Sequence, residues 1–319
     1  MAELLEDYSL VKKTQKKGTI QKIGLVGCGD VGQEICRLAA QCGLDVIFVD
    51  ISEQKVKEAF EHLNLQINDE INHWGLTESD KRAILSRIKG TTNYNDLKDC
   101  NIVHESVNTG SLVSNLELCR EVFRKIESAV QDDAIIASNS SSLTISELSN
   151  TLDHPERAIG MHFLRPLTKV KVVEISRGIN TNIKTLETIN RYSKMIGKDV
   201  ISLNESPGHI STRLIVTLIN EACELLMEGV GTVDSIDSMM KQGFGMQFGP
   251  FEMADRMGLD KVMKWMNNLY SEYSLQKFKA SPIIKRFVRN KYLGKITGKG
   301  FYKYENGQIT GSISTEFKY

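Results

Sequence analysis

The first two thirds of the chain alternate between short apolar runs and segments with helical periodicity. Continuous apolar runs occupy residues 23–26 and 46–49, and between them apolar side chains recur every three or four positions from Val31 to Ala39. Short apolar runs bounded by turn residues are typical of buried parallel strands. Apolar side chains at every third or fourth position predict a helix with one buried face. We therefore predict a strand, a helix and a second strand over residues 21–50.

The same alternation continues to residue 204. Residues 51–74 and 77–85 predict two helices, which we interpret as a helical hairpin inserted between the second and third strands. Further strands are predicted at residues 88–91, 101–104, 134–137, 157–163, 170–175 and 200–203, with helices over 116–130 and 182–196. Strands that alternate with helices indicate an α/β fold, a doubly wound sheet with parallel pairing at its core.

The pattern changes near residue 204, where we place a domain boundary. Glu205-Ser-Pro-Gly208 interrupts regular structure, and the sequence beyond it predicts helices and no strand before residues 301–304. The predicted helices cover residues 210–227, 232–243, 252–257, 259–273 and 283–290. They carry so many Leu, Ile and Met residues that some faces must be buried. Burial against a second copy and a purely intrachain core are both open at this point.

Composition excludes several classes of protein. The 319 residues include 40 basic and 40 acidic side chains, so no net field attracts nucleic acid or an anionic membrane. No apolar run has the length of a membrane span, and residues 1–18 predict a polar arm rather than a signal peptide. The six cysteines are scattered without a C-x-x-C pair, which predicts neither a metal site nor disulfides. We expect a cytosolic protein of two domains.

Three glycines lie in the turn between the first strand and the first helix. Gly27, Gly29 and Gly32 give the spacing G-x-G-x-x-G. In a dinucleotide site these glycines allow a tight turn, close approach of the backbone to the pyrophosphate, and close packing of helix on strand. An incidental glycine turn would explain the motif alone, but here the strand, helix, second strand and terminal acid all have their required places.

The acid at the end of the second strand indicates which nucleotide binds. Asp50 follows Gly32 by eighteen residues, where a carboxylate can bind both ribose hydroxyls of NAD and would repel the 2′-phosphate of NADP. The predicted cofactor is therefore NAD. The predicted cofactor-binding residues are Gly27, Gly29, Asp30, Val31, Gly32, Asp50 and Glu105.

Candidate catalytic groups follow later strands. Ser138-Asn-Ser-Ser-Ser142 comes directly after a strand, where such sheets bind ligands, although Ser142 or Thr144 with Glu147 would also cap the next helix. If the strands at 157–163 and 170–175 pair antiparallel about Thr168, His162 faces Glu174 with Cβ atoms about 5 Å apart. A lone strand histidine is usually structural. Next to a nicotinamide site, a histidine bonded to a carboxylate predicts a general base for alcohol oxidation.

The chain resembles the 3-hydroxyacyl-CoA dehydrogenase family over nearly its whole length. The matching segments are GCGDVG, ASNSSSL (137–143), MHFLRPLTKVKVVEI (161–175), SPGHISTRL (206–214), GPFEMADRMGLD (249–260) and GKITGKGFYKY (294–304). The resemblance implies a Rossmann-type NAD-binding domain over residues 19–204 that includes the inserted hairpin. It also implies an all-helical C-terminal dimerisation domain over 205–319, a homodimer, and an active site between the domains. It makes His162 the base and Glu174 its partner, with Ser141 bonded to the substrate hydroxyl.

Departures from the family pattern concern the substrate. Arg165 and Thr212 stand where the family has asparagines, and we predict that both contact substrate. Cys119 replaces a usual Lys, residues 107–114 are longer than usual, and residues 72–75 replace a segment that often carries a CoA-binding Lys. A permanent charge at position 165 suits an oxygenated acyl group. Weakened CoA contacts suit an acyl carrier protein.

We therefore expect NAD-dependent oxidation of the 3-hydroxyl of a thioester-bound 3-hydroxyacyl group, with the reverse reduction equally allowed by the chemistry. One alternative is a glyceryl-acyl-carrier-protein dehydrogenase of polyketide extender-unit biosynthesis. An alternative of another class is a catalytically idle NAD-binding scaffold. The two replaced asparagines motivate this alternative, and the retained Ser141, His162 and Glu174 argue against it.

Overall fold

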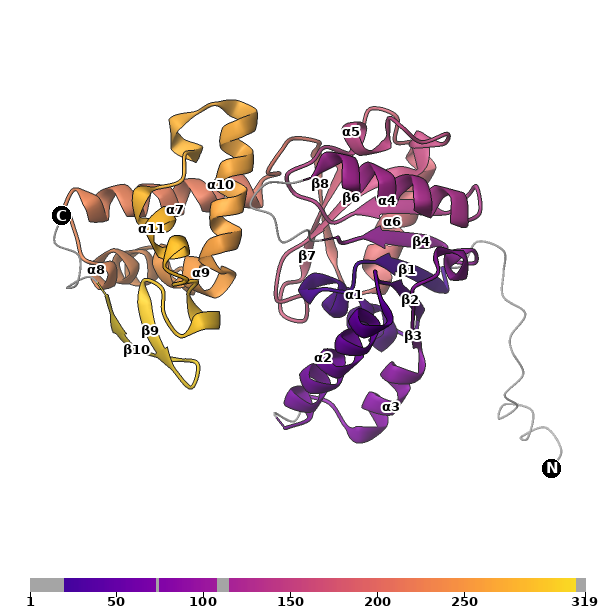
Figure 1. The fold of residues 1–319 in the computed structure, drawn as a ribbon, viewed down its shortest axis with the longest axis horizontal. Helices are drawn as coiled ribbons and strands as arrows, with labels where there is room; N and C mark the ends of the chain where they lie inside the picture. Colours follow the sequence, from indigo (N-terminus) through magenta and orange to yellow (C-terminus); the bar gives the residue numbers. More distant parts are fainter. Residues whose placement is uncertain (1–19, 73–74, 108–114, 314–319) are drawn as a thin grey trace.

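The computed structural model describes residues 20–72, 75–107 and 115–313, which form two lobes (Figure 1). The predicted polar arm over residues 1–18 lies outside the described residues. The N-terminal lobe ends with strand β8, and the chain then enters the C-terminal lobe at helix α7 (Ser211–Met227). No helix among the described residues combines the length and apolarity needed to cross a bilayer.

The N-terminal lobe contains one eight-stranded sheet in the order β3-β2-β1-β4-β5-β6-β7-β8. The strands are β1 (Lys22–Val26), β2 (Asp45–Val49), β3 (Ile88–Thr91), β4 (Ile102–Glu105), β5 (Ile135–Ser138), β6 (Ala158–Phe163), β7 (Val172–Arg177) and β8 (Asp199–Asn204). All neighbours are parallel except β6 and β7. The predicted Rossmann-type α/β sheet is confirmed, and the strand order reverses direction between β1 and β4, where such sheets bind nucleotides.

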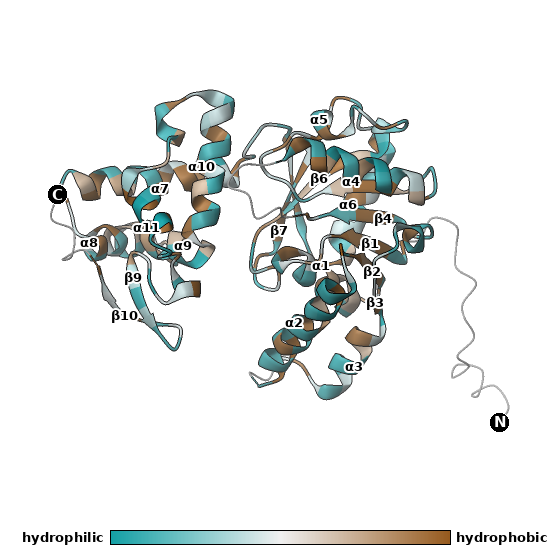
Figure 2. Ribbon diagram, viewed as in Figure 1, coloured by the Kyte–Doolittle hydropathy of each residue, from teal (hydrophilic) through white to brown (hydrophobic). Residues whose placement is uncertain are grey.

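Helices cover both faces of this sheet. One face packs on α1 (Asp30–Gln41), α2 (Glu53–Asn72) and α6 (Ile183–Met195), and the other on α4 (Leu116–Ala129) and α5 (Ile145–Ser149). Burial on both faces explains why the central strands are continuous apolar runs rather than alternating ones. Figure 2 shows these hydrophobic strands beside the largely hydrophilic outer surface of α4. Helices α2 and α3 (Glu78–Ser86) form the inserted hairpin.

The C-terminal lobe is mainly helical. It comprises α7, α8 (Val233–Ser238), a π-helical turn η4 (Met239–Gly243), α9 (Pro250–Met257), α10 (Leu259–Tyr273), α11 (Pro282–Arg289) and a hairpin of β9 (Tyr302–Glu305) and β10 (Gln308–Ser312). The prediction of an all-helical domain therefore omitted one antiparallel hairpin. Asn306 and Gly307 both have positive φ, as the two-residue hairpin turn requires, so the Asn-Gly pair was the sequence signal for it.

Candidate active site

The glycine turn joins β1 to α1 at the carboxyl edge of the sheet. Gly27 has φ +89°, and a Cβ at Gly32 would lie 2.3 Å from the carbonyl oxygen of Gly27, so neither position accepts a side chain without distortion. A Cβ on Gly29 would meet nothing within 4 Å, which leaves its backbone open to a ligand. The turn thus has the cradle shape that a pyrophosphate needs at a helix N-terminus.

Two predicted cofactor-binding acids lie beside this turn. Asp50 accepts the backbone N–H of Cys28 through Oδ2 at 2.9 Å, so the end of β2 is tied to the glycine turn. Glu105 ends β4 opposite Val26 of β1 and is buried. Its Oε2 accepts the hydroxyl of Ser138 at 2.7 Å, and burial raises the pKa of its carboxyl above the usual range. The structure therefore places these acids at the edge where the sequence expects NAD.

Asp30 and Arg165 belong to an ion network between the lobes. Asp30 begins α1, and its Oδ2 lies 2.9 Å from Nζ of Lys261 in α10 and 3.2 Å from Nη1 of Arg165. The hydrogen bond from Lys261 is the largest of the effects that hold the pKa of Asp30 below its usual range. Arg165 also donates from Nε to Oε1 of Glu34 at 2.6 Å. The guanidinium charge is therefore balanced by two carboxylates of α1, and its contact with substrate stays a prediction.

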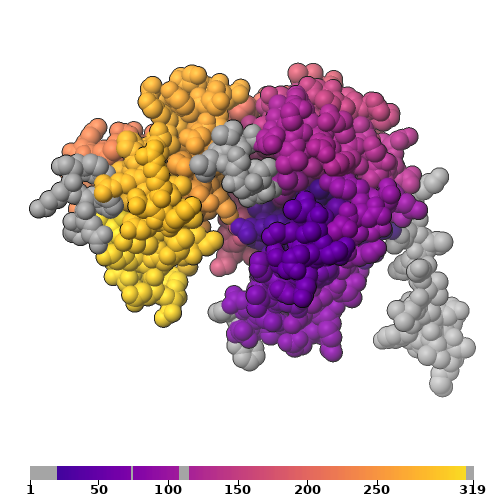
Figure 3. All heavy atoms as spheres, in the orientation of Figure 1, coloured from indigo at the N-terminus to yellow at the C-terminus, as the bar shows by residue number. Residues whose placement is uncertain are grey.

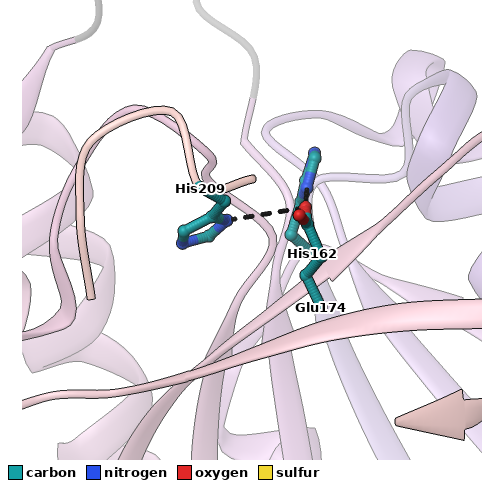
Figure 4. Close-up of side chains that lie close together, drawn as sticks. All are labelled: His162, Glu174 and His209. Atoms are coloured by element: carbon teal, nitrogen blue, oxygen red, sulfur yellow. Dashed lines mark hydrogen bonds and ion pairs between the residues drawn. The ribbon is translucent and has the colours of Figure 1, made fainter. Parts of the chain in front are cut away.

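The antiparallel pair β6 and β7 places His162 directly opposite Glu174, which confirms the register predicted from the sequence. Nδ1 of His162 lies 2.8 Å from Oε2 of Glu174, and both residues are buried (Figure 4). At the start of α7, Ile210 and Ser211 donate backbone N–H groups to Oε1 at 3.1 and 2.9 Å, and the Ser211 hydroxyl donates to Oε2 at 2.7 Å. The carboxylate is thus fixed from both lobes.

These donors keep Glu174 ionised. Burial alone would raise the pKa of this carboxyl, but the hydrogen bonds from His162 and Ser211 outweigh it and lower the pKa to about 2. An ionised carboxylate can only accept, so Nδ1 of His162 is assigned as the protonated ring nitrogen. The lone pair then lies on Nε2, which is the arrangement of a neutral imidazole ready to accept a proton.

His209 is a second buried imidazole at this carboxylate, and sequence reasoning missed it. Its Nδ1 lies 3.9 Å from Oε2 of Glu174, and its ring centroid is 5.5 Å from that of His162 (Figure 4). Burial and the neighbouring His162 lower the pKa of His209 to about 4, so it is neutral near pH 7. The signal in the sequence was the imidazole of Pro207-Gly-His-Ile, where the family pattern has Phe.

The serine loop and the start of α7 complete the region. Ser141 is buried, and its carbonyl accepts the N–H of Gly208 at 2.5 Å, so the loop after β5 contacts the segment that carries His209. Thr212 is buried in the first turn of α7, directly after Ser211. The sequence also predicted that this loop caps the next helix, through Ser142 or Thr144. Thr144 is the cap of α5, in a capping box with Glu147. The catalytic and substrate roles of Ser141 and Thr212 stay predictions.

The structure says less about the other three departures from the family pattern, which are Cys119 and residues 72–75 and 107–114. Cys119 is buried in α4 within the apolar cluster on that face of the sheet. Most of the segments at residues 72–75 and 107–114 lies outside the described residues.

Figure 3 shows a hollow between the C-terminal lobe and the helices α1 to α3.

Comparison with known proteins gives matches over both lobes. The family model described as the NAD-binding domain of 3-hydroxyacyl-CoA dehydrogenase matches residues 22–206, and the model of its C-terminal domain matches residues 208–304. A 3-hydroxybutyryl-CoA dehydrogenase of Bradyrhizobium diazoefficiens is 34% identical over 91% of this chain and 97% of its own length. A 3-hydroxybutyryl-CoA dehydrogenase of Clostridioides difficile is 33% identical over 89% of this chain and 99% of its own length.

The same relationship appears among solved structures. The (S)-3-hydroxybutyryl-CoA dehydrogenase of Ralstonia eutropha is similar to this chain with a TM-score of 0.81 and 36% identity. The similarity covers 90% of this chain and 100% of the other. The likeness therefore includes the sheet, the helical lobe and the way in which they are joined.

Proposed function

The chain belongs to the 3-hydroxyacyl-CoA dehydrogenase family, and from this membership we propose that it oxidises the 3-hydroxyl group of a thioester-bound 3-hydroxyacyl substrate. It is an NAD-dependent oxidoreductase that acts on a CH–OH group. The observation that carries the assignment of the base is the His162–Glu174 pair, 2.8 Å apart at the end of β6. It supports an active enzyme over an idle scaffold.

In the proposed mechanism His162 is the general base. Glu174 accepts the hydrogen bond from Nδ1, so Nε2 is the nitrogen that takes the proton of the substrate hydroxyl. Hydride leaves the carbon that bears this hydroxyl. Glu174 then stabilises the imidazolium that forms. NAD, when bound at the glycine turn, supplies the nicotinamide ring that accepts the hydride. Ser141 orients the substrate hydroxyl in this proposal, and the reverse reduction uses the same groups.

We propose coenzyme A as the carrier of the acyl group. The relatives named above are 3-hydroxybutyryl-CoA dehydrogenases, and they match along nearly their full lengths. The carrier-protein alternative had two motives: the charge of Arg165 suited an oxygenated acyl group, and the altered CoA contacts suited another carrier. The structure bears on the first motive. The Arg165 guanidinium is bound to Asp30 and Glu34, which weakens that motive.

NADH absorbance with two substrates in parallel tests this function. We expect NAD-dependent turnover of 3-hydroxybutyryl-CoA, with kcat of about 1–10³ per second. Turnover of a glyceryl-loaded carrier protein alone would contradict the CoA assignment. No turnover of either thioester would contradict the dehydrogenase proposal as a whole.

We also propose that the active form is a homodimer assembled through the C-terminal lobe. Ile210, directly before α7, and Leu214, one helical turn later, are both exposed. Single exposed apolar side chains are normal, but adjacent ones form a patch of the kind that marks an interaction surface. Light scattering should give twice the chain mass for the wild type, and Leu214→Glu should reduce it to one chain. A monomeric wild type would contradict the assembly.

A further inference from the structure

The imidazole of His209 is buried, and one of its two ring nitrogens makes no hydrogen bond within the described part of the chain. Its side chain is only 3% exposed, and its Nδ1 has no hydrogen-bond partner among the described residues. A buried polar atom left unpaired costs about 1–3 kcal/mol, and such atoms in native proteins usually have a water, an ion or a functional reason. The cost is concentrated at one atom, and that atom points toward the carboxylate of the active site (Figure 4).

Three ligand-type atoms converge at this point. Nδ1 of His162 and Nδ1 of His209 approach the same oxygen, Oε2 of Glu174, at 2.8 and 3.9 Å. The nearest ligand atoms of the three residues all lie within 4.8 Å of one another. Zinc binds nitrogen and oxygen at about 2.0–2.2 Å, so ligand atoms in a tetrahedral site lie about 3.3 Å apart. Small side-chain rotations would therefore bring these three atoms around one ion.

The surroundings also suit a metal site. Oε1 of Glu174 is held by the backbone N–H groups of Ile210 and Ser211, which orient the carboxylate as outer contacts orient metal ligands. Two imidazoles and one carboxylate form a donor set that favours zinc and related transition ions. Magnesium and calcium prefer oxygen ligands and would bind poorly here.

We propose that His162, Glu174 and His209 bind one Zn²⁺ ion reversibly, and that the bound ion stops the dehydrogenase by reversing the tautomer of His162. This inference rests on the proposed role of His162 as the base. It also revises the prediction from sequence, which included no metal site, because that prediction considered cysteine spacing and not an imidazole that begins the other lobe.

The proton balance explains the inhibition. Without metal, Nδ1 of His162 carries the ring proton and donates it to Glu174. A nitrogen that binds zinc must offer its lone pair, so the ring proton moves from Nδ1 to Nε2 and the imidazole stays neutral. Nε2 can then donate a hydrogen bond but cannot accept the proton of the substrate hydroxyl. No oxidation or reduction is involved, and a chelator restores the original tautomer.

Cobalt titration of the full chain tests binding without any substrate. We expect one Co²⁺ per chain, with visible d–d bands of a tetrahedral site that disappear when Zn²⁺ is added. His209→Asn is the informative variant, because Asn tolerates positive φ as His209 does at +46° and its amide is a poor ligand. Metal affinity should fall at least about 100-fold, since loss of outer contacts alone costs 10–100-fold.

A matched control separates this site from adventitious binding to histidine. His154 also has its Nδ1 near a carboxylate, 3.3 Å from Oε1 of Glu156, but both side chains are exposed. His154→Asn should leave the cobalt bands and the zinc affinity unchanged. Bands that persist in His209→Asn, or that vanish in His154→Asn, would overturn the proposal, as would a wild type that binds no cobalt.

Activity supplies a second readout. Micromolar Zn²⁺ should inhibit NADH formation by the wild type, and a chelator should reverse the inhibition; the residual activity of His209→Asn should be insensitive to the same zinc concentration. Equal zinc sensitivity in both proteins would overturn the mechanism. If cobalt binds and neither thioester is oxidised, the proposed function fails while the metal site stands. If thioester is oxidised and no cobalt binds, only the metal site fails.

Discussion

Two buried carboxylates, one in each lobe, have similar surroundings and different consequences. Glu174 in β7 and Asp255 in α9 are 3% and 1% exposed, and each accepts two backbone N–H groups. Asp255 receives those of Phe301 and Tyr302, both at 2.9 Å, together with the hydroxyl of Tyr304 at 3.1 Å. Each carboxylate thus ties together segments that are distant in the sequence.

The difference lies in the remaining partner. Burial raises the pKa of the Tyr304 hydroxyl, so this group stays protonated near neutral pH and only donates to Asp255, whose own pKa is raised by burial to about 7. Glu174 is paired with an imidazole whose other nitrogen remains available. The chain also closes tightly on Asp255, since a Cβ on Gly300 would lie 2.0 Å from its Oδ1. A buried acid is thus a structural clamp in one lobe, and in the other it supports a group that can move a proton.

Removal of the imidazole should give the largest effect on activity. His162→Gln eliminates the proposed base, and we expect kcat to fall about 10³-fold, equivalent to about 4 kcal/mol of barrier. The free energy of unfolding should change much less, because the glutamine side chain can still donate to Glu174. NADH formation and urea unfolding on the same samples measure both quantities. A rate within about tenfold of the wild type would contradict the assigned role.

Disruption of the structural carboxylate should give the opposite result. Asp255→Asn places an amide NH₂ against donors, and we expect about 3 kcal/mol less stability with kcat per folded molecule nearly unchanged. Urea unfolding measures the loss. Asp133→Asn, at an exposed position between α4 and β5, is the matched control and should be neutral. A large fall in kcat for Asp255→Asn would mean that the two carboxylates are not functionally distinct.

The fully buried histidine of β4, His104, should produce a pH dependence of stability. Burial lowers the pKa of His104 to about 3, whereas an unfolded histidine titrates near 6.5. Between these values only the unfolded chain binds the proton, so stability is complete above pH 6.5 and falls by about 1.4 kcal/mol per pH unit below it.

His104→Gln removes this contribution and serves as the comparison. The difference in unfolding free energy between wild type and variant should shrink by about 1.4 kcal/mol from pH 7.5 to pH 5.5. Urea unfolding at the two pH values measures it. A difference that does not change with pH would show that His104 becomes protonated in the folded protein. Unlike His162, this imidazole has no carboxylate partner among the described residues, and its Nε2 forms a hydrogen bond with the hydroxyl of Tyr192 at 3.1 Å.

Removal of the exposed ion pair between Lys261 and Asp30 should give the smallest effect on activity. Asp30 is 58% exposed in its pair with Lys261, and exposed pairs contribute about 0.2–1 kcal/mol. Lys261→Met should therefore change the KM for NAD by less than about threefold, and high salt should reduce even that difference. Initial rates at low and high salt measure both effects. A tenfold or larger change in KM would assign Lys261 to cofactor binding.

Local sequence was sufficient for the elements and for part of the site. The glycine turn, the acid that ends β2 and the alternation of strands and helices all depend on residues within one βαβ unit. The pairing of His162 with Glu174 was predictable as well, because strands joined by a short turn pair about its midpoint. The β9–β10 hairpin had a local signal in Asn306-Gly307 that was not used.

The long-range contacts could not be predicted from local patterns, although His209 departs from the family pattern at its own position. His209 follows Glu174 by 35 residues and reaches it only because α7 begins beside Glu174, near the start of β7. Lys261 lies 231 residues from Asp30. Arg165 was expected to offer a free charge to substrate, yet Glu34 of α1 binds it. The sequence by itself determined the fold, the cofactor and the central pair, since short-range periodicity and strand register encode them. Only the tertiary structure decided that Arg165 is paired with α1 inside its own lobe, and that docking of the lobes brings Lys261 to Asp30 and His209 to Glu174.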